Sequence, residues 1–506
     1  MTTPSQPTVL ERASAKRKKP LLARVPADFV RAVLKGHSAL GLAFAAAIYL
    51  VCLSGSLAVF AHEFQRWELA GLPRVEVLSA EAAQRALAEA VRRGGAGVEH
   101  VYITPPSADL PQATVHVEGT AGKESTWLAD AEGRIAARAD MPWTEFITRL
   151  HIHLHLPQVW GMFLVGLTGV ALLSSLISGI LAHPRILRDA FHLRLGGARR
   201  LQEADLHNRI GVWALPFHVL VSLSGAVLGL TTLIVGVLGM ALFQGDTAKV
   251  YALFIAQEPR EDPRPAPVID LRPMFAQVER LAPGGQVSLV MLEHPTEMGA
   301  AALFYVDRGG RRLADRDSFA FERGGRLYHE KRAADANLGE SILGSIGKLH
   351  FGWFGGYLVK IAYALLGLGL TYLAAGGVTI WLARRRDKRN PAPGLERLWA
   401  ATLWGQPAAL AGAALTALLA PSAGTMVPLA TWGAVTLVGL ASAVRLSVFA
   451  IRRIGRVFTG ALLLATATIH AGTIGGTDPV AWTIDGVLVL SGAALLFARR
   501  RSRPAP

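Results

Sequence analysis

Cysteine is nearly absent from this chain: Cys52 is the only one among 506 residues. A single thiol excludes an intrachain disulfide, a multi-cysteine zinc site and an iron–sulfur cluster built by one chain. Metal chemistry would therefore depend on the 15 histidines. The sequence also lacks a GxGxxG pattern after a strand, a P-loop and an HExxH motif. These absences exclude the common nucleotide, flavin and zinc-protease modules.

Charged residues are also scarce, at 18% of the chain against 51% hydrophobic residues. The apolar residues form runs of about twenty or more, which is long enough to cross a bilayer. The formal charge of +15 would suggest nucleic acid as the partner of a soluble protein. Here, however, each basic cluster lies beside an apolar run, as the positive-inside rule produces. We therefore predict a polytopic membrane protein whose partner is the lipid bilayer, with no nucleic-acid partner.

The apolar segments contain a duplication. His37, Gly41 and Leu53-Ser54-Gly55 have the same spacing as His207, Gly211 and Leu223-Ser224-Gly225. Further along, His151 opens a segment that ends in Ser178-Gly179, and His350 opens one that ends in Gly376-Gly377. The chain therefore contains two copies of a unit made of a helix, a polar domain and a second helix, with a histidine at the start of each helix.

These patterns predict an all-α polytopic bundle of about eight transmembrane helices, the first four forming a duplicated pair, with two small external α+β domains. The predicted order is a basic cytoplasmic tail (1–36), span one (37–60), external domain one (61–145), span two (146–183), a cytoplasmic loop (184–206), span three (207–240), external domain two (241–347), span four (348–383), a cytoplasmic loop (384–397), four additional spans (398–498) and a cytoplasmic tail (499–506). Pro216 is expected to kink span three next to His218.

Each predicted external domain begins with a helix and continues with strands. Helical periodicity covers residues 80–93 and 271–281, and alternating or β-rich stretches follow each of them. The predicted strands lie at 98–105, 113–119, 287–294, 301–307 and within 318–331.

The four repeated histidines form the candidate site. The two halves have the same orientation, so an axis along the membrane normal relates them. This axis places His37 opposite His207 near the inner face and His151 opposite His350 near the outer face. Facing imidazoles at two depths are what bis-histidine haem ligation requires, so we predict two haems b that connect the two sides of the membrane. The alternative is that these are interfacial histidines that bond headgroups or cap helices.

The small residues near these histidines have a predicted role as well. Gly41, Gly211, Gly55 and Gly225 would let a flat macrocycle approach the helix backbones closely.

Three further histidines are weaker ligand candidates. His218 would point the same way as His207 on a continuous helix, although Ile48 stands at its equivalent in span one. The HIHLH stretch at 151–155 could present three imidazoles on one face if extended, whereas a helix would pair only His151 with His155. His183 lies at the inner end of span two and could instead be a solvated cap.

These motifs resemble a known family, the PepSY-associated transmembrane proteins, which include iron-regulated membrane proteins and ferric-siderophore reductases. The resemblance rests on GHSALG with LSGSLAVF, LHIHLHLPQVWG with LISGILAHPRILRDAFHLR, LHNRIGVWALPFH with LSGA, and LHFGWFGG. It covers about residues 30–386. It implies PepSY-like external domains, haem b held by His37, His151, His207 and His350, with His155, His183 and His218 as extra candidates, and a location in the bacterial inner membrane. Ser38 stands where the family has an arginine, while Arg209 follows His207 more nearly as expected.

Three functions follow as hypotheses. The first is a haem-dependent ferric-siderophore reductase, which would pass electrons from a quinol or a separate cytoplasmic reductase to an external ferric acceptor. The second is a non-enzymatic membrane protein whose PepSY-like domains bind or regulate an envelope partner. The third is an iron or haem transporter, which the parallel repeat and the lack of acidic residues within the first four predicted spans disfavour.

Overall fold

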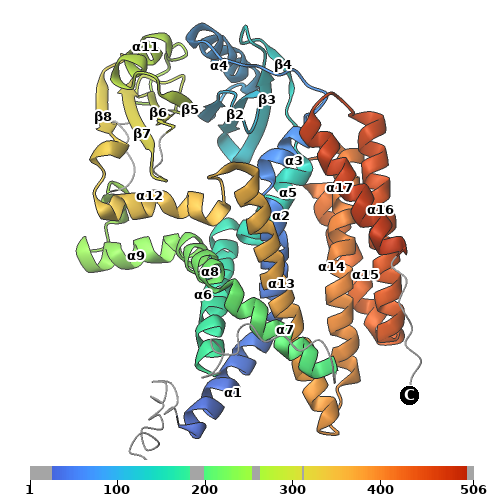
Figure 1. The fold of residues 1–506 in the computed structure, drawn as a ribbon. Helices are drawn as coiled ribbons and strands as arrows, with labels where there is room; N and C mark the ends of the chain where they lie inside the picture. Colours follow the sequence, from blue (N-terminus) through green and yellow to red (C-terminus); the bar gives the residue numbers. More distant parts are fainter. Residues whose placement is uncertain (1–25, 183–198, 254–261, 310–312, 498–506) are drawn as a thin grey trace, which may run out of the picture.

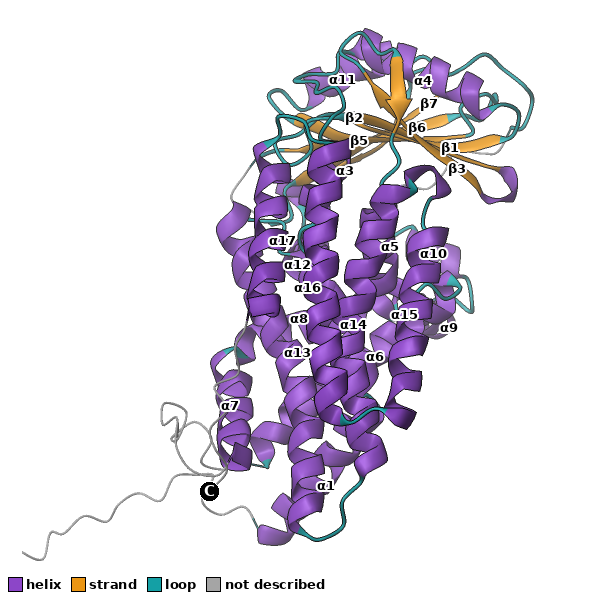
Figure 2. Ribbon diagram, turned by 90° about the vertical axis from the view of Figure 1, so that its right-hand side faces the viewer, coloured by secondary structure: helices purple, strands orange, loops and turns teal. Residues whose placement is uncertain are grey.

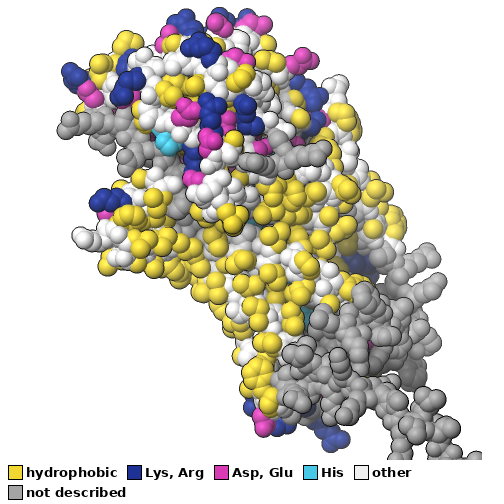
Figure 3. Space-filling view, turned by 60° about the vertical axis from the view of Figure 1, so that its left-hand side comes forward, with side chains coloured by type: hydrophobic (Ala, Val, Ile, Leu, Met, Phe, Trp, Pro, Cys, Tyr) yellow, Lys and Arg dark blue, Asp and Glu magenta, His cyan; other side chains and the backbone are white. Residues whose placement is uncertain are grey.

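The computed structural model describes residues 26–182, 199–253, 262–309 and 313–497. Helices form a long bundle, and an antiparallel sheet with its own helices lies across one end of it (Figures 1 and 2). We call the end of the bundle next to the sheet the sheet side, and the opposite end the distal side. Figure 3 shows hydrophobic side chains over the helical part of one face, while charged side chains gather over the sheet.

The duplication is visible in the helices. The first copy contains α1 (Ala27–Ala43), α2 (Ala45–Ala58), α3 (Ala61–Glu68), α5 (Pro142–His153) and α6 (Gln158–Leu181). The second contains α7 (Arg199–Trp213), α8 (Leu215–Gly229), α9 (Thr231–Leu242), α12 (Leu338–Phe351) and α13 (Gly356–Asp387), with the short α10 (Thr247–Tyr251) after α9. Predicted spans one to four are thus each built from two or more helices.

The first helix pair of each copy is bent at an equivalent place. The bend is 65° between α1 and α2, and 71° between α7 and α8. The linking residues have similar backbone angles: Phe44 has φ −102° and ψ 3°, and Ala214 has φ −99° and ψ 12°. Pro216 lies in the first turn of α8, where its missing N–H breaks no intrahelical bond. The kink near Pro216 was predicted, but the matching bend at Phe44 shows that it belongs to the repeat.

The second helix pair of each copy is separated by a tight turn. Leu154 and His155 have positive φ angles of 56° and 53° between α5 and α6, and Gly352 and Gly355 have φ angles of 71° and 87° between α12 and α13. The HIHLH stretch is therefore neither an extended strand nor one continuous helix. His151 and His350 consequently lie near the ends of the short helices α5 and α12, ahead of the long helices that follow.

Five described helices are long and apolar enough to cross a membrane, namely α6, α13, α14 (Pro393–Leu419), α15 (Met426–Arg445) and α17 (Pro479–Phe497). The number rises to seven if each bent pair, α1–α2 and α7–α8, is one span. The 24 residues of α6 measure about 36 Å at 1.5 Å per residue, enough for the hydrocarbon core. The remaining predicted span, the seventh in chain order, corresponds to α16 (Val448–Thr473), whose first half contains Arg452, Arg453 and Arg456. The total of eight stays a prediction.

The strands form a single eight-stranded antiparallel sheet with the order β4-β3-β2-β1-β5-β6-β7-β8. Its strands are β1 (Val98–Thr104), β2 (Ala113–Gly119), β3 (Lys123–Ala129), β4 (Ile135–Arg138), β5 (Gln286–Glu293), β6 (Ala301–Asp307), β7 (Arg316–Glu322) and β8 (Leu327–Lys331). β1, β2, β5 and β6 coincide closely with predicted strands, and β7 and β8 match the predicted stretch within 318–331, whereas β3 and β4 were not among the predicted strands. The prediction of two separate external domains is corrected, because β1 pairs with β5 across the two copies, with His100 opposite Glu293 and Ile103 opposite Val290.

One hydrophobic core serves both halves of this sheet. Helices α4 (Ala80–Gly94) and α11 (Arg272–Leu281) cover the same face, away from the bundle (Figure 2). Leu87 of α4 and Met274 of α11 are fully buried in one cluster, together with Ile103, Val290 and Phe304 from the strands. Burying this apolar surface is the main source of stability for the sheet layer, and both halves contribute side chains to it.

The C-terminal helices α14–α17 pack beside the first copy through a buried polar network. Trp67 of α3 donates from its indole nitrogen to Asp485 of α17 at 2.9 Å, and His470 of α16 contacts the same carboxylate at 2.7 Å. Arg66 forms a two-bond ion pair with Asp478 at 2.8 and 2.9 Å. These bonds fix α16 and α17 to α3 in one orientation, since buried polar groups require specific partners.

Replacing Asp485 with alanine should destabilise this junction. The change leaves the buried Trp67 indole N–H without its acceptor and the His470 Nδ1 atom without its partner, at a cost of about 1 to 3 kcal/mol for each group. We expect a lower Tm for the Asp485→Ala protein in detergent. Thr468→Ala is the matched control, because Thr468 is exposed and bonds only the Leu464 carbonyl of its own helix. Equal Tm values for the two variants would contradict this role.

Candidate functional site

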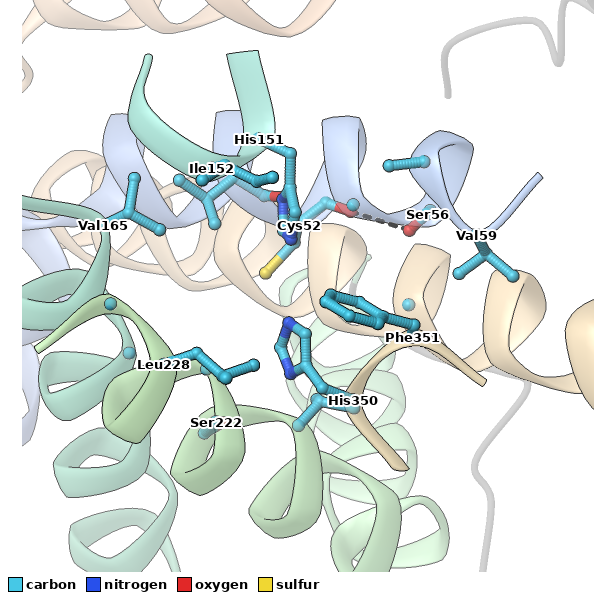
Figure 4. Close-up of a pocket in the computed structure, with 18 of the residues that line it drawn as sticks. Cys52, Ser56, Val59, His151, Ile152, Val165, Ser222, Leu228, His350 and Phe351 are labelled. Carbon is cyan, nitrogen blue, oxygen red and sulfur yellow. Dashed lines mark hydrogen bonds between the residues drawn. The ribbon is translucent and has the colours of Figure 1, made fainter. Parts of the chain in front are cut away.

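Two of the repeated histidines face each other in a cavity on the sheet side of the bundle. The rings of His151 and His350 have centroids 6.1 Å apart and an interplanar angle of 17°. Figure 4 shows them pointing into the same space from α5 and α12, with the Cys52 sulfur nearby. Residues that are 199 positions apart in the chain are thus brought together by the two copies of the repeat.

Hydrogen bonds orient both rings. The Nδ1 atom of His151 lies 3.0 Å from the Val51 carbonyl oxygen, which can only accept, so Nδ1 carries the proton. The Nδ1 atom of His350 lies 2.9 Å from the Ser224 hydroxyl oxygen, which itself donates to the Leu220 carbonyl at 2.6 Å. Donation through Nδ1 leaves the Nε2 lone pair of each ring available. This is how metal-binding histidines are usually held.

A glycine makes room for each of these rings. A Cβ atom on Gly55 of α2 would lie 2.6 Å from Cε1 of His151, and a Cβ on Gly225 of α8 would lie 2.9 Å from Cε1 of His350. Distances below 3.0 Å are too short for a normal contact, so any larger residue would have to displace the imidazole. Gly55 and Gly225 of the two LSG motifs therefore make room for the histidine rings. The sequence analysis had instead predicted that these glycines make room for a macrocycle.

The cavity around His151 and His350 has a volume of about 480 Å³. That volume falls within the range of ligand pockets in proteins, about 300–1,000 Å³. No Asp, Glu, Lys or Arg is among the residues that line it, and most of the lining is aliphatic or aromatic. Such a lining is suited to an apolar group.

The other two repeated histidines share a second cavity, of about 200 Å³, towards the distal side. His37 of α1 and His207 of α7 both line it. The Nδ1 atom of His37 lies 3.0 Å from the Ser175 carbonyl oxygen and 3.1 Å from the Ser178 hydroxyl oxygen, so this ring too can donate through Nδ1. Leu172 lines both cavities, which places them next to each other along the bundle.

Glycines also lie against these distal rings. A Cβ on Gly179 of α6 would meet His37 at 3.5 Å, and one on Gly376 of α13 would meet His207 at 3.6 Å. Each of the four histidines therefore packs against a glycine of its own repeat copy. By contrast, a Cβ on Gly41 or Gly211 would meet nothing within 4 Å, and both glycines line the distal cavity.

The weaker candidates lie elsewhere. His218 is fully buried, lines neither cavity, and neither of its ring nitrogens has a hydrogen-bond partner among the described residues. The bend at Ala214 removes the continuous helix on which its alignment with His207 was predicted. The Nε2 atom of His155 bonds the Phe146 carbonyl at 2.9 Å, so this nitrogen is already occupied. His183 lies outside the described residues.

The sequence analysis missed a buried ion pair near the sheet-side cavity. Lys360 of α13 donates to Glu63 of α3 at 2.7 Å, and their side chains are 3% and 6% exposed. Next to Glu63, the His62 ring lies against Trp353, with centroids 4.3 Å apart and the planes tilted by 36°, and Trp353 lines the cavity. The available signal was a lysine inside an apolar segment, which is costly without a partner.

Glu68 positions the helix that carries His151. Glu68 is the last residue of α3. Its carboxylate accepts hydrogen bonds from the backbone N–H groups of Trp143 and Thr144, in the first turn of α5, at 2.7 and 2.9 Å. It thereby satisfies two of the donors that a helix start leaves unpaired. Burial nevertheless raises the pKa of the Glu68 carboxyl from 4.5 to about 7.

This raised pKa predicts a pH dependence of stability. The folded protein holds the Glu68 proton up to about pH 7, whereas the unfolded chain releases it near pH 4.5. The contribution of Glu68 to the free energy of unfolding therefore decreases as the pH rises from about 4.5 to 7. We expect thermal unfolding in detergent to show a smaller loss of Tm over this interval in Glu68→Gln than in the unchanged protein. Parallel curves for the two proteins would contradict the prediction.

Comparison with known proteins places these features in context. The family model described as the PepSY-associated TM region matches residues 34–384, which contain both cavities and the sheet. An uncharacterised protein of Pseudomonas aeruginosa is 30% identical over 293 residues, covering 56% of this chain and 74% of that protein. The matched region of the family ends before α14, so helices α14–α17 lie beyond it.

Proposed function

Because the chain belongs to the PepSY-associated transmembrane family, we propose that it is a haem b protein of the bacterial inner membrane. It would carry electrons across the membrane and reduce an external ferric acceptor, such as a ferric siderophore. In this proposal the sheet lies outside the cytoplasm and the distal side faces it. The donor would be a quinol or a separate cytoplasmic reductase.

The facing pair His151 and His350 carries the proposal. Two imidazoles that shared one metal ion, each through a bond of about 2 Å, would have ring centres no more than about 6 Å apart. The observed separation is 6.1 Å. Both rings also keep Nε2 available. The residues present therefore fit one iron between them.

Each part of the site has a distinct task in this function. Haem supplies a one-electron Fe(III)/Fe(II) couple when bound. His151 and His350 would ligate it on the sheet side, and His37 and His207 on the distal side. Val51, Ser175 and Ser224 hold three of these rings in their tautomer and orientation, and the apolar lining excludes water. Transfer to a ferric acceptor would release its iron, because siderophores bind Fe(II) weakly.

The adjacency of the two cavities also supports the proposal. Leu172 is common to both linings, so a group in one cavity would lie close to a group in the other. Two ligation sites in sequence along the bundle are what electron transfer across a bilayer requires.

The test is an absorption spectrum of the full chain purified in detergent, before and after reduction with dithionite, with haem quantified as the pyridine complex. We expect sharp reduced bands of low-spin haem b and about two haems per chain. A colourless protein, even after haem is supplied during expression, would overturn the proposal. It would favour binding of an envelope partner by the sheet layer.

A further inference from the structure

Three consecutive arginines end helix α13 at the distal side, and two of them have partners. Arg385 donates to the side chain of Asn390 at 3.1 Å and lies over the Trp381 ring, 5.1 Å from its centroid. Arg386 pairs with Glu396 at 2.7 Å. Both are thus occupied in holding the connection between α13 and α14.

Arg384 differs from its two neighbours. Its guanidinium makes no hydrogen bond or ion pair with any part of the chain that the structure describes, and the residue lines the distal cavity with His37 and His207. Among the residues that line this cavity there is no Asp or Glu to balance it. Among the residues that the structure describes, the lining of this cavity therefore contains one guanidinium and no carboxylate.

The other polar groups at this rim complete a site for an acidic group. Ser38 and Asn208 line the cavity together with Arg384 and can donate hydrogen bonds. A guanidinium binds a carboxylate through two parallel bonds, and such charge-assisted pairs are about twice as strong as neutral ones. No Asp, Glu, Lys or Arg is among the residues that line the sheet-side cavity, so that lining offers no guanidinium for a carboxylate.

We propose that Arg384 binds a carboxylate of the group held in the distal cavity, which under the proposed function is a propionate of haem. This inference rests on that function. Arg384 would then fix the orientation of the macrocycle, with its acidic edge towards the distal side and its apolar edge towards Leu172. Arg384 acts here as a cofactor-binding residue, distinct from the ligands themselves.

The experiment uses the full chain with His151→Ala and His350→Ala, so that only the distal site can take up haem. Haem and haem dimethyl ester, in which both carboxylates are blocked, are titrated into this protein in detergent and followed by the Soret band. We expect Arg384→Gln to weaken haem binding about tenfold, the loss of one such pair. It should leave binding of the ester unchanged. Arg386→Gln, which removes the same charge from the same helix turn, should change neither affinity more than about twofold.

Two results would overturn the inference. One is an equal loss of haem affinity in Arg384→Gln and Arg386→Gln, which would mean a general effect of charge. The other is an equal loss for haem and its ester, which would mean a structural role. Failure of the proposed function is a separate result, because the unmodified chain would then bind no haem at either site.

Discussion

If the chain holds two haems as proposed, replacing His350 with alanine is expected to halve the haem content of the purified protein, from about two haems per chain to about one. The imidazole of His350 faces His151 at 6.1 Å between centroids, and no other histidine lines this cavity in the described parts of the chain. Loss of one axial ligand should therefore empty the site or leave a weakly held high-spin haem. The measurement is the haem-to-protein ratio, together with the low-spin signal in electron paramagnetic resonance of the oxidised protein.

The control for this variant is His329→Ala. His329 lies in strand β8 of the sheet and lines neither cavity. It should keep both haems and both low-spin signals. An unchanged haem ratio in His350→Ala would show that the sheet-side pair is not an iron site.

Replacing Gly55 with alanine should disable the same site without touching a ligand. The added methyl carbon would lie 2.6 Å from Cε1 and 2.9 Å from Nδ1 of His151, so the ring must leave its position on the Val51 carbonyl. Overpacking of this kind costs about 1 to 3 kcal/mol. We expect the loss of one low-spin haem signal, because the ligand can no longer face His350.

Gly36→Ala is the matched control for this substitution. Gly36 is also helical, in α1, and a Cβ there would meet nothing within 4 Å. Its haem content should equal that of the unchanged protein. If Gly55→Ala also retained both haem signals and the same Tm, the glycine would have no role in positioning His151.

The repeat gives both predictions a second test. Gly225 contacts His350 as Gly55 contacts His151, with a Cβ distance of 2.9 Å. Gly225→Ala should therefore have the same effect from the other copy. Duplication explains this arrangement, since the same contact between a histidine and a glycine occurs once in each copy of the repeat.

The sequence by itself determined the features that depend on local pattern. Apolar runs and basic clusters predicted a membrane protein, and alternation predicted strands that coincide closely with β1, β2, β5 and β6. The internal repeat selected His37, His151, His207 and His350 among 15 histidines. The tertiary structure brings two of these into ring contact and the other two into one cavity.

Only the tertiary structure decided the features that depend on contacts between distant segments. The pairing of β1 with β5 joins two predicted domains into one sheet. Sequence pattern could not predict this pairing, because either strand could equally have remained at the edge of its own sheet. The bend at Phe44 has no proline or other local signal. Lys360 and Glu63 balance each other from helices almost 300 positions apart, and Arg384 differs from Arg385 and Arg386 only in its surroundings. Sequence pattern records which side chains are available, whereas packing decides which of them meet.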